Sequence, residues 1–225
     1  MIVHSLIVDD GTSLQVVEHG SVTGRPLVLL HDLDCSWQYW SPVISRLLAR
    51  QPELRILAMD LRGHGASGSA EEPSRKRLVK DVKRVCKQLS IEEPVLIGHG
   101  WGADVAMASE VAGSVVAINP LMGREPEAFG ADVPRPPDLL GAVSPQLLER
   151  ARIGATTAKA LRRSQRDAPL FLVYADPADS AAVAGSDALE VAWDVLAWQS
   201  ATRHLPLEMP DGVTAILLSW IEEVA

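Results

Sequence analysis

The sequence has little cysteine, no excess of basic residues and no long apolar run. Its two cysteines, Cys35 and Cys86, show no paired spacing, so neither a disulfide framework nor a zinc site is expected. The formal net charge of −8 argues against a general affinity for nucleic acid or anionic membranes. No run approaches the roughly 20 apolar residues of a membrane span, and the N-terminus is unlike a signal peptide. We therefore expect a cytoplasmic protein that binds neither nucleic acid nor membrane.

The apolar pattern predicts a sheet of mostly parallel strands. Residues 2–8 and 13–19 favour two strands joined by a tight turn. Beyond them, short apolar runs typical of strands buried on both faces alternate with stretches of helical spacing. The runs are 27–30, 56–60, 94–97, 115–118 and 170–174, and the helical stretches are 37–50, 75–89 and 212–223. Residues 184–199 favour either a short strand at 194–199 or one helix. The alternation predicts an α/β fold with helices on both faces of the sheet.

The chain is long enough for one domain with a large core, because it has 225 residues of which 47% are hydrophobic. Residues 121–168 interrupt the alternation with prolines, glycines and acidic residues. A basic helix is predicted at about 146–166, with Ser144 as its capping residue and Pro145 in its first turn. We predict a single domain over residues 1–225 that carries a short cap insertion at about 121–168.

One short motif points to a catalytic turn that lacks its nucleophile. Residues 98–102 read Gly-His-Gly-Trp-Gly, which is the G-x-S-x-G frame of a nucleophile elbow with a glycine where the serine belongs. The motif follows the apolar run 94–97 and precedes a helix-like stretch at 103–108, which is the strand, turn and helix context that an elbow requires. Because Gly100 has no side chain, no acyl or alkyl enzyme can form at that position.

Four segments together carry a family resemblance. They are 31–37 (His-Asp-Leu-Asp-Cys-Ser-Trp), 60–67 (Asp-Leu-Arg-Gly-His-Gly-Ala-Ser), the motif at 98–102, and 203–210 (Arg-His-Leu-Pro-Leu-Glu-Met-Pro). In their order and spacing the chain resembles the α/β-hydrolase superfamily over essentially its whole length. The resemblance implies the α/β-hydrolase fold and a triad of elbow serine, acid and histidine, with two backbone N–H groups as the oxyanion hole.

The resemblance assigns the histidine and the acid of that triad to the last third of the chain. His204 corresponds to the family's catalytic histidine, because it stands four residues before the Glu-x-Pro that begins the last helix. The acid is expected just past the strand that ends at Tyr174. Asp179 is the first choice and Asp176 the second, although this segment departs from the family's G-x-x-D spacing.

The oxyanion donors implied by the resemblance are the backbone N–H of Trp101 and one N–H from Asp32 or Leu33. Relatives with this pattern usually have His-Gly where this chain has His31-Asp32. A carboxylate beside an oxyanion hole opposes the negative charge of an acyl-transfer transition state. Loss of the nucleophile alone would fit a Ser→Gly substitution made to trap a substrate. Its loss together with the altered loop favours natural divergence.

Other residues near these motifs have both a functional and a structural interpretation. His31, His99 and Cys35 are candidates for contacts with the substrate or the oxyanion. His99 holds the variable elbow position and can be structural, and nothing near Cys35 in the sequence would lower its pKa enough for a displaced nucleophile. We expect His64 to be structural, and the aromatic residues at 37–40 to line the core or the pocket wall.

These residues favour proton transfer without covalent catalysis. We expect a cofactor-free enzyme in which His204, a supporting aspartate and Asp32 act on a small, largely apolar molecule such as a natural-product intermediate. Cyclisation, isomerisation, elimination and decarboxylation all fit, and the pocket could also act by holding one conformation. Two alternatives stay open: a serine esterase or thioesterase with a Ser→Gly change at position 100, and a non-catalytic pseudohydrolase that binds a ligand or a protein. The sequence does not determine the substrate or the oligomeric state.

Overall fold

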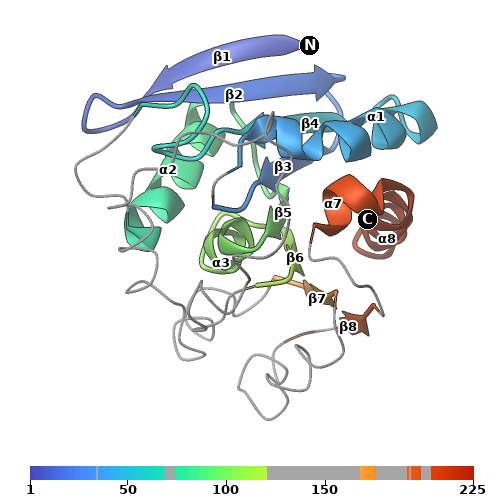
Figure 1. Ribbon diagram of the computed structural model, residues 1–225. Coiled ribbons are helices and arrows are strands. Elements are labelled where there is room, and N and C mark those ends of the chain that lie inside the picture. Colours follow the sequence, from blue (N-terminus) through green and yellow to red (C-terminus); the bar gives the residue numbers. More distant parts are fainter. Residues whose placement is uncertain (34, 69–73, 121–167, 176–191, 193, 199–203) are drawn as a thin grey trace.

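The strands form one mixed sheet whose order differs from the chain order. The computed structural model describes residues 1–33, 35–68, 74–120, 168–175, 192, 194–198 and 204–225. Its eight strands follow the order β1-β2-β4-β3-β5-β6-β7-β8 (Figure 1). They are β1 Ile2–Ile7, β2 Ser13–Gly20, β3 Pro26–Leu30, β4 Arg55–Met59, β5 Val95–His99, β6 Ser114–Ile118, β7 Leu170–Tyr174 and β8 Asp194–Ala197. β1 and β2 are antiparallel, β2 pairs antiparallel with β4, and every other pair is parallel. The predicted mostly parallel sheet is confirmed.

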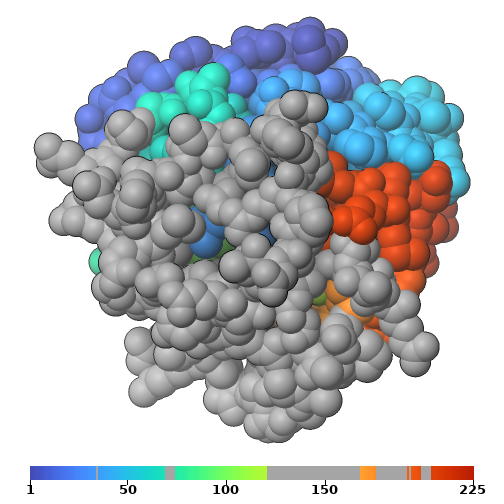
Figure 2. Space-filling model, in the orientation of Figure 1, coloured from blue at the N-terminus to red at the C-terminus, as the bar shows by residue number. Residues whose placement is uncertain are grey.

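Helices cover both faces of this sheet, as predicted. They are the 3₁₀ helix η1 Trp37–Trp40 and the α-helices α1 Ser41–Arg50, α2 Arg75–Gln88, α3 Trp101–Met107, α7 Leu205–Glu208 and α8 Pro210–Glu223. Alternate residues of β3 enter two separate cores, because successive side chains of a strand point to opposite faces. Val28 and Leu30 pack with α2 and α3, whereas Leu27 and Leu29 pack with α1 and α8. In the space-filling view α7 and α8 lie directly against α1 (Figure 2).

The structure refines two of the predicted segments, and a third lies almost entirely outside the described residues. The helical stretch at 37–50 is divided into η1 and α1, and Pro42 stands in the first turn of α1, where a missing N–H costs nothing. Residues 194–197 form strand β8, which decides the ambiguity at 184–199 in favour of a strand there. Apart from Ala168, the cap insertion predicted at 121–168 lies outside the described residues.

The topology brings two distant loops together at the centre of the sheet. β3 and β5 are parallel neighbours, with Leu30 opposite Gly98. The chain leaves both strands at the same edge, so the loop after β3 and the turn after β5 lie side by side. Parallel α/β sheets characteristically bind ligands at the carboxyl ends of their strands. Asp32 and Gly100 follow β3 and β5 by two residues and one residue, so both stand at this edge.

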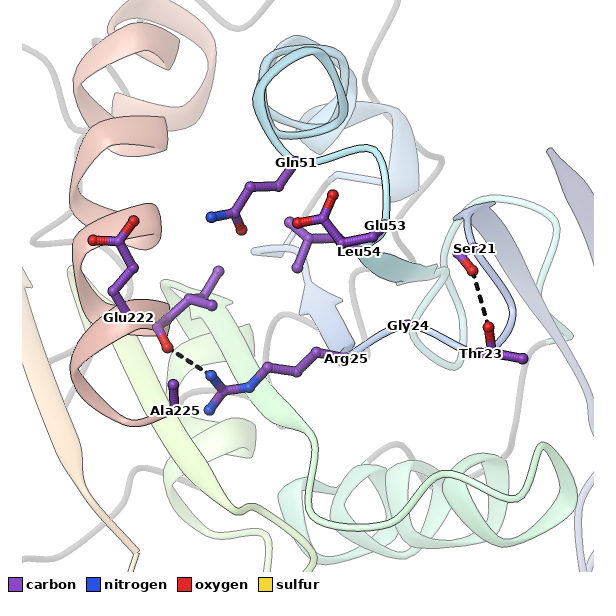
Figure 3. Close-up of a pocket in the computed structure, with 10 residues that line it drawn as sticks. Ser21, Thr23, Gly24, Arg25, Gln51, Glu53, Leu54, Glu222 and Ala225 are labelled. Atoms are coloured by element: carbon purple, nitrogen blue, oxygen red, sulfur yellow. Dashed lines mark hydrogen bonds between the residues drawn. The ribbon is translucent and has the colours of Figure 1, made fainter.

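At the opposite edge of the sheet, Arg25 fixes the end of α8. Its guanidinium donates hydrogen bonds to the carbonyl oxygens of Ile221 at 2.6 Å and Val224 at 2.7 Å. A cation at a helix C-terminus satisfies carbonyl groups that have no partner within the helix. Beside Arg25 is a cleft of about 480 Å³, lined also by Gln51 and Glu222 (Figure 3). Because Arg25 precedes β3 whereas Asp32 follows it, this cleft is separate from the edge described above.

We expect Arg25→Met to destabilise the fold by about 1–3 kcal/mol, since it leaves two carbonyl groups without a charged donor. Urea denaturation followed by circular dichroism measures the loss. Lys80→Met, which removes an exposed cation from α2, is the matched control and should change the free energy of unfolding by less than about 0.5 kcal/mol. Equal effects of the two substitutions would contradict a capping role for Arg25.

Candidate functional site

The turn between β5 and α3 has Gly100 at its centre in a strained conformation. Gly100 has φ 53° and ψ −118°, and this positive φ is strained for any residue with a side chain. Its N–H donates to the carbonyl of Ile118 at 2.9 Å, which holds the turn against the end of β6. A Cβ at Gly102 would lie 2.3 Å from the carbonyl oxygen of Leu30, so α3 packs closely on β3. The strand, tight turn and helix expected of an elbow are all present.

The Asp32 carboxylate lies over this turn and holds two backbone donors. Its Oδ1 accepts hydrogen bonds from the N–H of Trp101 at 2.7 Å and the N–H of Leu33 at 2.8 Å. Its Oδ2 lies 3.7 Å from Nδ1 of His99, and the side chain is 24% exposed. Two N–H groups on one oxygen favour the ionised carboxylate. The two donors predicted for an oxyanion therefore converge on a single point, and a carboxylate oxygen occupies it.

Asp32 and Gly100 share one space. A Cβ built on Gly100 would lie 2.1 Å from Cγ of Asp32 and 2.2 Å from each of its carboxylate oxygens. The atoms that such a Cβ would meet are all at the end of the Asp32 side chain, so a side chain at position 100 would require this carboxylate to move. In this arrangement, a side chain at position 100 and the carboxylate of Asp32 exclude each other.

His31 holds the loop that carries Asp32. Its Nε2 accepts a hydrogen bond from the N–H of Leu61 at 3.0 Å, so the proton of the neutral ring is on Nδ1, which donates to the carbonyl of Asp32 at 2.6 Å. The ring is fully buried. Burial, and then the neighbouring His64, hold the pKa of His31 well below its usual value. His31 was predicted to contact substrate or oxyanion, but both of its ring nitrogens bond to backbone, which makes it a support for the site.

Three aromatic rings form a cluster next to the carboxylate. The hydroxyl of Tyr39 lies 3.4 Å from Nδ1 of His204. The ring of Tyr39 lies 5.1 Å from the ring of His99 and 6.1 Å from that of His204, and the two imidazoles are 6.3 Å apart. Tyr39 and His99 are 1% and 2% exposed. Burial, together with Cys35, Asp32 and Glu208, raises the pKa of Tyr39 well above 10, so the phenol stays protonated at neutral pH.

Asp60 holds the backbone at the start of the segment that carries Tyr39. This buried carboxylate accepts hydrogen bonds from the N–H of Trp37 at 2.7 Å and the N–H of Ala66 at 2.9 Å. Trp37 is the first residue of η1, so the bond sets where Tyr39 stands. Burial raises the pKa of Asp60, while these two hydrogen bonds oppose that shift. The loop at 60–67 thus supports the site without entering it.

Most of the site residues predicted from sequence lie at this edge. Asp32, Leu33, His99, Gly100 and Trp101 meet directly through the contacts above. His204 joins them through Tyr39. Two further predictions are not tested, because Asp176 and Asp179 lie outside the described residues.

Three further residues are Cys35, which was predicted from the sequence, and Tyr39 and Asn119, for which the sequence predicted no role at the site. Cys35 is buried near Tyr39, with which it interacts electrostatically. Tyr39 was expected to line the core or the pocket wall, and aromatic residues that pack give the same sequence signal as those that contact a catalytic group. Asn119 was also missed: it has φ 47° after β6, and its side-chain oxygen accepts the N–H of Ala175 at 2.6 Å. This bond joins the ends of β6 and β7, just before Asp176.

Neither a metal site nor a membrane span is found in the part of the chain that the structure describes. No three His, Cys, Asp or Glu side chains there are grouped so that they could hold a metal ion. Among the described helices, none has the length and apolar character needed to cross a bilayer.

Comparison with known proteins identifies hydrolases as relatives. A model of the alpha/beta hydrolase family matches residues 27–221. The chain is 40% identical over 88 residues to an sn-1-specific diacylglycerol lipase of Xenopus laevis, and this alignment covers 39% of the chain and 28% of the lipase. It is 35% identical over 109 residues to a soluble epoxide hydrolase of a Corynebacterium species, and this alignment covers 47% of the chain and 35% of that enzyme. The alignments thus span about a third or less of these relatives.

Solved structures agree with this assignment at the level of fold. A carboxylesterase of the archaeon Nitrososphaera gargenis superposes with a TM-score of 0.77 at 18% identity, over 99% of this chain and 98% of the esterase. A sequence identity this low supports a shared fold, whereas function depends on the residues at the site.

The overlap between Asp32 and Gly100 predicts a measurable coupling. We expect Gly100→Ser to lower the free energy of unfolding by about 1–3 kcal/mol, because the added side chain meets the carboxylate. In an Asp32→Gly background the same substitution should cost at least about 1 kcal/mol less. Chemical denaturation of the four proteins in this double-mutant cycle measures the difference. Additive effects would show that the two side chains do not compete for one space.

The buried His31 predicts a loss of stability in acid. Its pKa is lowered in the folded state, so below about pH 6.5 only the unfolded chain takes up the proton. The free energy of unfolding should therefore fall as the pH drops from about 7 to about 5, by up to roughly 1.4 kcal/mol per pH unit. Urea titrations across this range measure the slope. His31→Gln should flatten it, and an unchanged slope would rule out His31 as its source.

Proposed function

The chain belongs to the alpha/beta hydrolase family, and we propose that it is an enzyme in which Asp32, rather than a side chain at position 100, performs the chemistry. It uses this carboxylate with His204 to move protons on a small, largely apolar molecule, and it needs no cofactor. The reaction class is elimination, isomerisation, cyclisation or decarboxylation. Relatives carry out hydrolysis, so the proposal is a departure from their chemistry on the same fold.

The observation that carries this proposal is the place of the Asp32 carboxylate. Acyl transfer through a tetrahedral intermediate needs two free N–H groups to stabilise a new oxyanion. Here the N–H groups of Leu33 and Trp101 already bind a carboxylate oxygen. A second negative charge at the same point would be repelled by the first. The arrangement therefore opposes acyl transfer and favours a reaction in which the carboxylate itself takes part.

The remaining geometry divides the proton transfers between two groups. Oδ1 of Asp32 accepts both backbone N–H groups, and we assign to Oδ2, 3.7 Å from Nδ1 of His99, the proton taken from a substrate C–H. The electron pair released from that bond moves to a neighbouring atom or expels a leaving group. His204 stands across the cluster and can return a proton at that second atom. The proton held by Asp32 then passes through solvent water to His204, so both groups return to their starting states without a covalent intermediate.

A second candidate function is favoured by the same two hydrogen bonds. A carboxylate can act as a nucleophile, and Oδ2 of Asp32 could attack an electrophilic carbon, as in an epoxide, and form an ester while the carbon–oxygen bond of the ring breaks. The ring oxygen would take up a proton from His204. Water would then attack Cγ of Asp32 and give a proton to His204, and the charge on Oδ1 would be stabilised by Leu33 and Trp101. The Cγ–Oδ2 bond would then break, so that the diol leaves with Oδ2. One oxygen atom of that water would remain in the carboxylate. Hydrolysis through Asp32 is thus chemically consistent with the site.

The alternatives in which Asp32 takes no part predict other behaviour. If the chain were an esterase with a Ser→Gly change, Gly100→Ser alone would restore ester hydrolysis. The overlap of that side chain with Asp32 argues against this outcome. If the chain were a binding pseudohydrolase, a bound ligand would persist in both Asp32→Asn and His204→Ala, and no product would form in any variant.

Three probes separate these functions: an activated aryl ester, styrene oxide, and 5-nitrobenzisoxazole, whose ring opens when a base removes its C–H proton. We expect turnover of the benzisoxazole by the wild-type protein and a fall of roughly 10²–10⁴-fold in Asp32→Asn, since the amide is not a base. Glu92→Gln, which removes an exposed carboxylate, is the matched control and should leave the rate unchanged. Full activity in Asp32→Asn would overturn the proposal.

Isotope labelling distinguishes the base from the nucleophile. A single turnover of styrene oxide in H₂¹⁸O, followed by peptide mass spectrometry, reports whether Asp32 acquires ¹⁸O. Proton transfer predicts no label, whereas an ester intermediate on Asp32 predicts one labelled oxygen.

A further inference from the structure

Helix α2 carries most of the lysines of the chain on one exposed face. It covers the face of the sheet opposite to α1 and α8 (Figure 1). Its buried side, with Leu78, Val82 and Val85, packs on the core, and its outer side contains four of the five lysines of the chain. These four exposed residues, which we call the lysine stripe, are Lys76, Lys80, Lys83 and Lys87. Their spacing keeps them within about 60° of arc around the helix axis and over a length of about 16 Å.

The charges of α2 oppose the stability of the helix that carries them. Successive lysines of the stripe are three or four residues apart, and like charges at these spacings repel one another. The first turn of α2 has three basic residues at 75–77 and no acidic one, although the helix dipole favours acidic residues there. The only acid of the helix, Asp81, is buried and accepts a hydrogen bond from Arg62. A surface pattern that disfavours its own helix is typical of a binding role.

The stripe is a narrow band of positive charge with an acidic residue on each side. Lys83 lies 3.8 Å from Glu110, which follows α3, and Arg84 pairs with Asp9, which follows β1. The side chains of Glu110 and Asp9 are 71% and 67% exposed. The other three lysines of the stripe form no ion pair with any residue in the described part of the chain. Their charge is therefore available to a partner.

We propose that the lysine stripe is a docking surface for an acidic α-helix of a partner protein. A helix with carboxylates at the same spacing would place one of them opposite each lysine along about three turns. A DNA duplex or an anionic bilayer would contact a wider area, and would meet Asp9, Glu110 and the field of a chain with a net charge of −8. A single acidic helix is narrow enough to avoid those charges. The inference concerns α2 and does not depend on the reaction proposed for Asp32.

Fluorescence anisotropy with a labelled peptide tests this surface. The probe is an alanine-rich helical peptide of about 18 residues with four glutamates at the spacing of the stripe. Its control peptide has glutamine at the same four positions. We expect the wild-type protein to bind the glutamate peptide at least about 10-fold more tightly at low ionic strength, and this preference should shrink as salt is added, because salt screens exposed charges.

Substitutions in the stripe test where the peptide binds. Lys80→Gln/Lys87→Gln should weaken binding of the glutamate peptide by roughly 3–30-fold, since each exposed ion pair contributes modestly. Lys80→Arg/Lys87→Arg keeps both charges and should retain the affinity. Arg46→Gln/Arg50→Gln, which removes two charges from α1, is the matched control and should leave the affinity unchanged. Circular dichroism checks that each variant is folded, and glutamine, like lysine, is a good helix former.

Several results would overturn the proposal. Equal binding of the two peptides to the wild-type protein would do so, as would equal losses in the α2 and α1 variants. Tighter binding of a DNA duplex or of phosphatidylserine vesicles than of the glutamate peptide, at the same salt, would assign the stripe to a nucleic acid or a membrane instead. A salt-sensitive dimer in sedimentation that is lost in Lys80→Gln/Lys87→Gln would assign it to a second copy of the chain.

Discussion

The carboxylate of Asp32, held by two backbone N–H groups above Gly100, is the constraint on which the site depends. One oxygen takes the place where an oxyanion would be stabilised, and the whole group fills the space that a side chain at position 100 would need. The conformation of Asp32 and the residue type at position 100 therefore depend on each other. A glycine at the elbow makes room for the carboxylate, and the carboxylate makes acyl transfer at that elbow unfavourable.

The surrounding structure holds this carboxylate in place from several elements. His31 ties the carbonyl of Asp32 to the loop after β4, and Asp60 fixes the first residue of η1. Tyr39 extends from η1 to His204, which lies immediately before α7. Hydrolases share this fold, yet here the same edge of the sheet presents a carboxylate, a phenol and two imidazoles. The change of chemistry that we propose on this retained fold rests on the residues at that edge, since function depends on the site.

The fold could be predicted from the sequence because burial on both faces gives strands such as 27–30 a continuous apolar run. Strand β8 was ambiguous because it is short and largely exposed, so it lacks that signal. The participants of the site were mostly identified by motif, but their arrangement was not. Tyr39 lies 165 positions from its partner His204, and a packed aromatic has the same local pattern whether or not it touches a catalytic group. The overlap at Gly100 arises only when β3 and β5 pair.

A high-resolution crystal structure of the ligand-free protein tests the central claim most directly. Our account predicts Oδ1 of Asp32 within hydrogen-bonding distance of the backbone nitrogens of Leu33 and Trp101, near the 2.8 Å and 2.7 Å given above. The carboxylate should cover Gly100 and leave no room for a Cβ. An Asp32 side chain that points away, with water or an anion between the two N–H groups, would contradict the account and return the site to an open oxyanion hole.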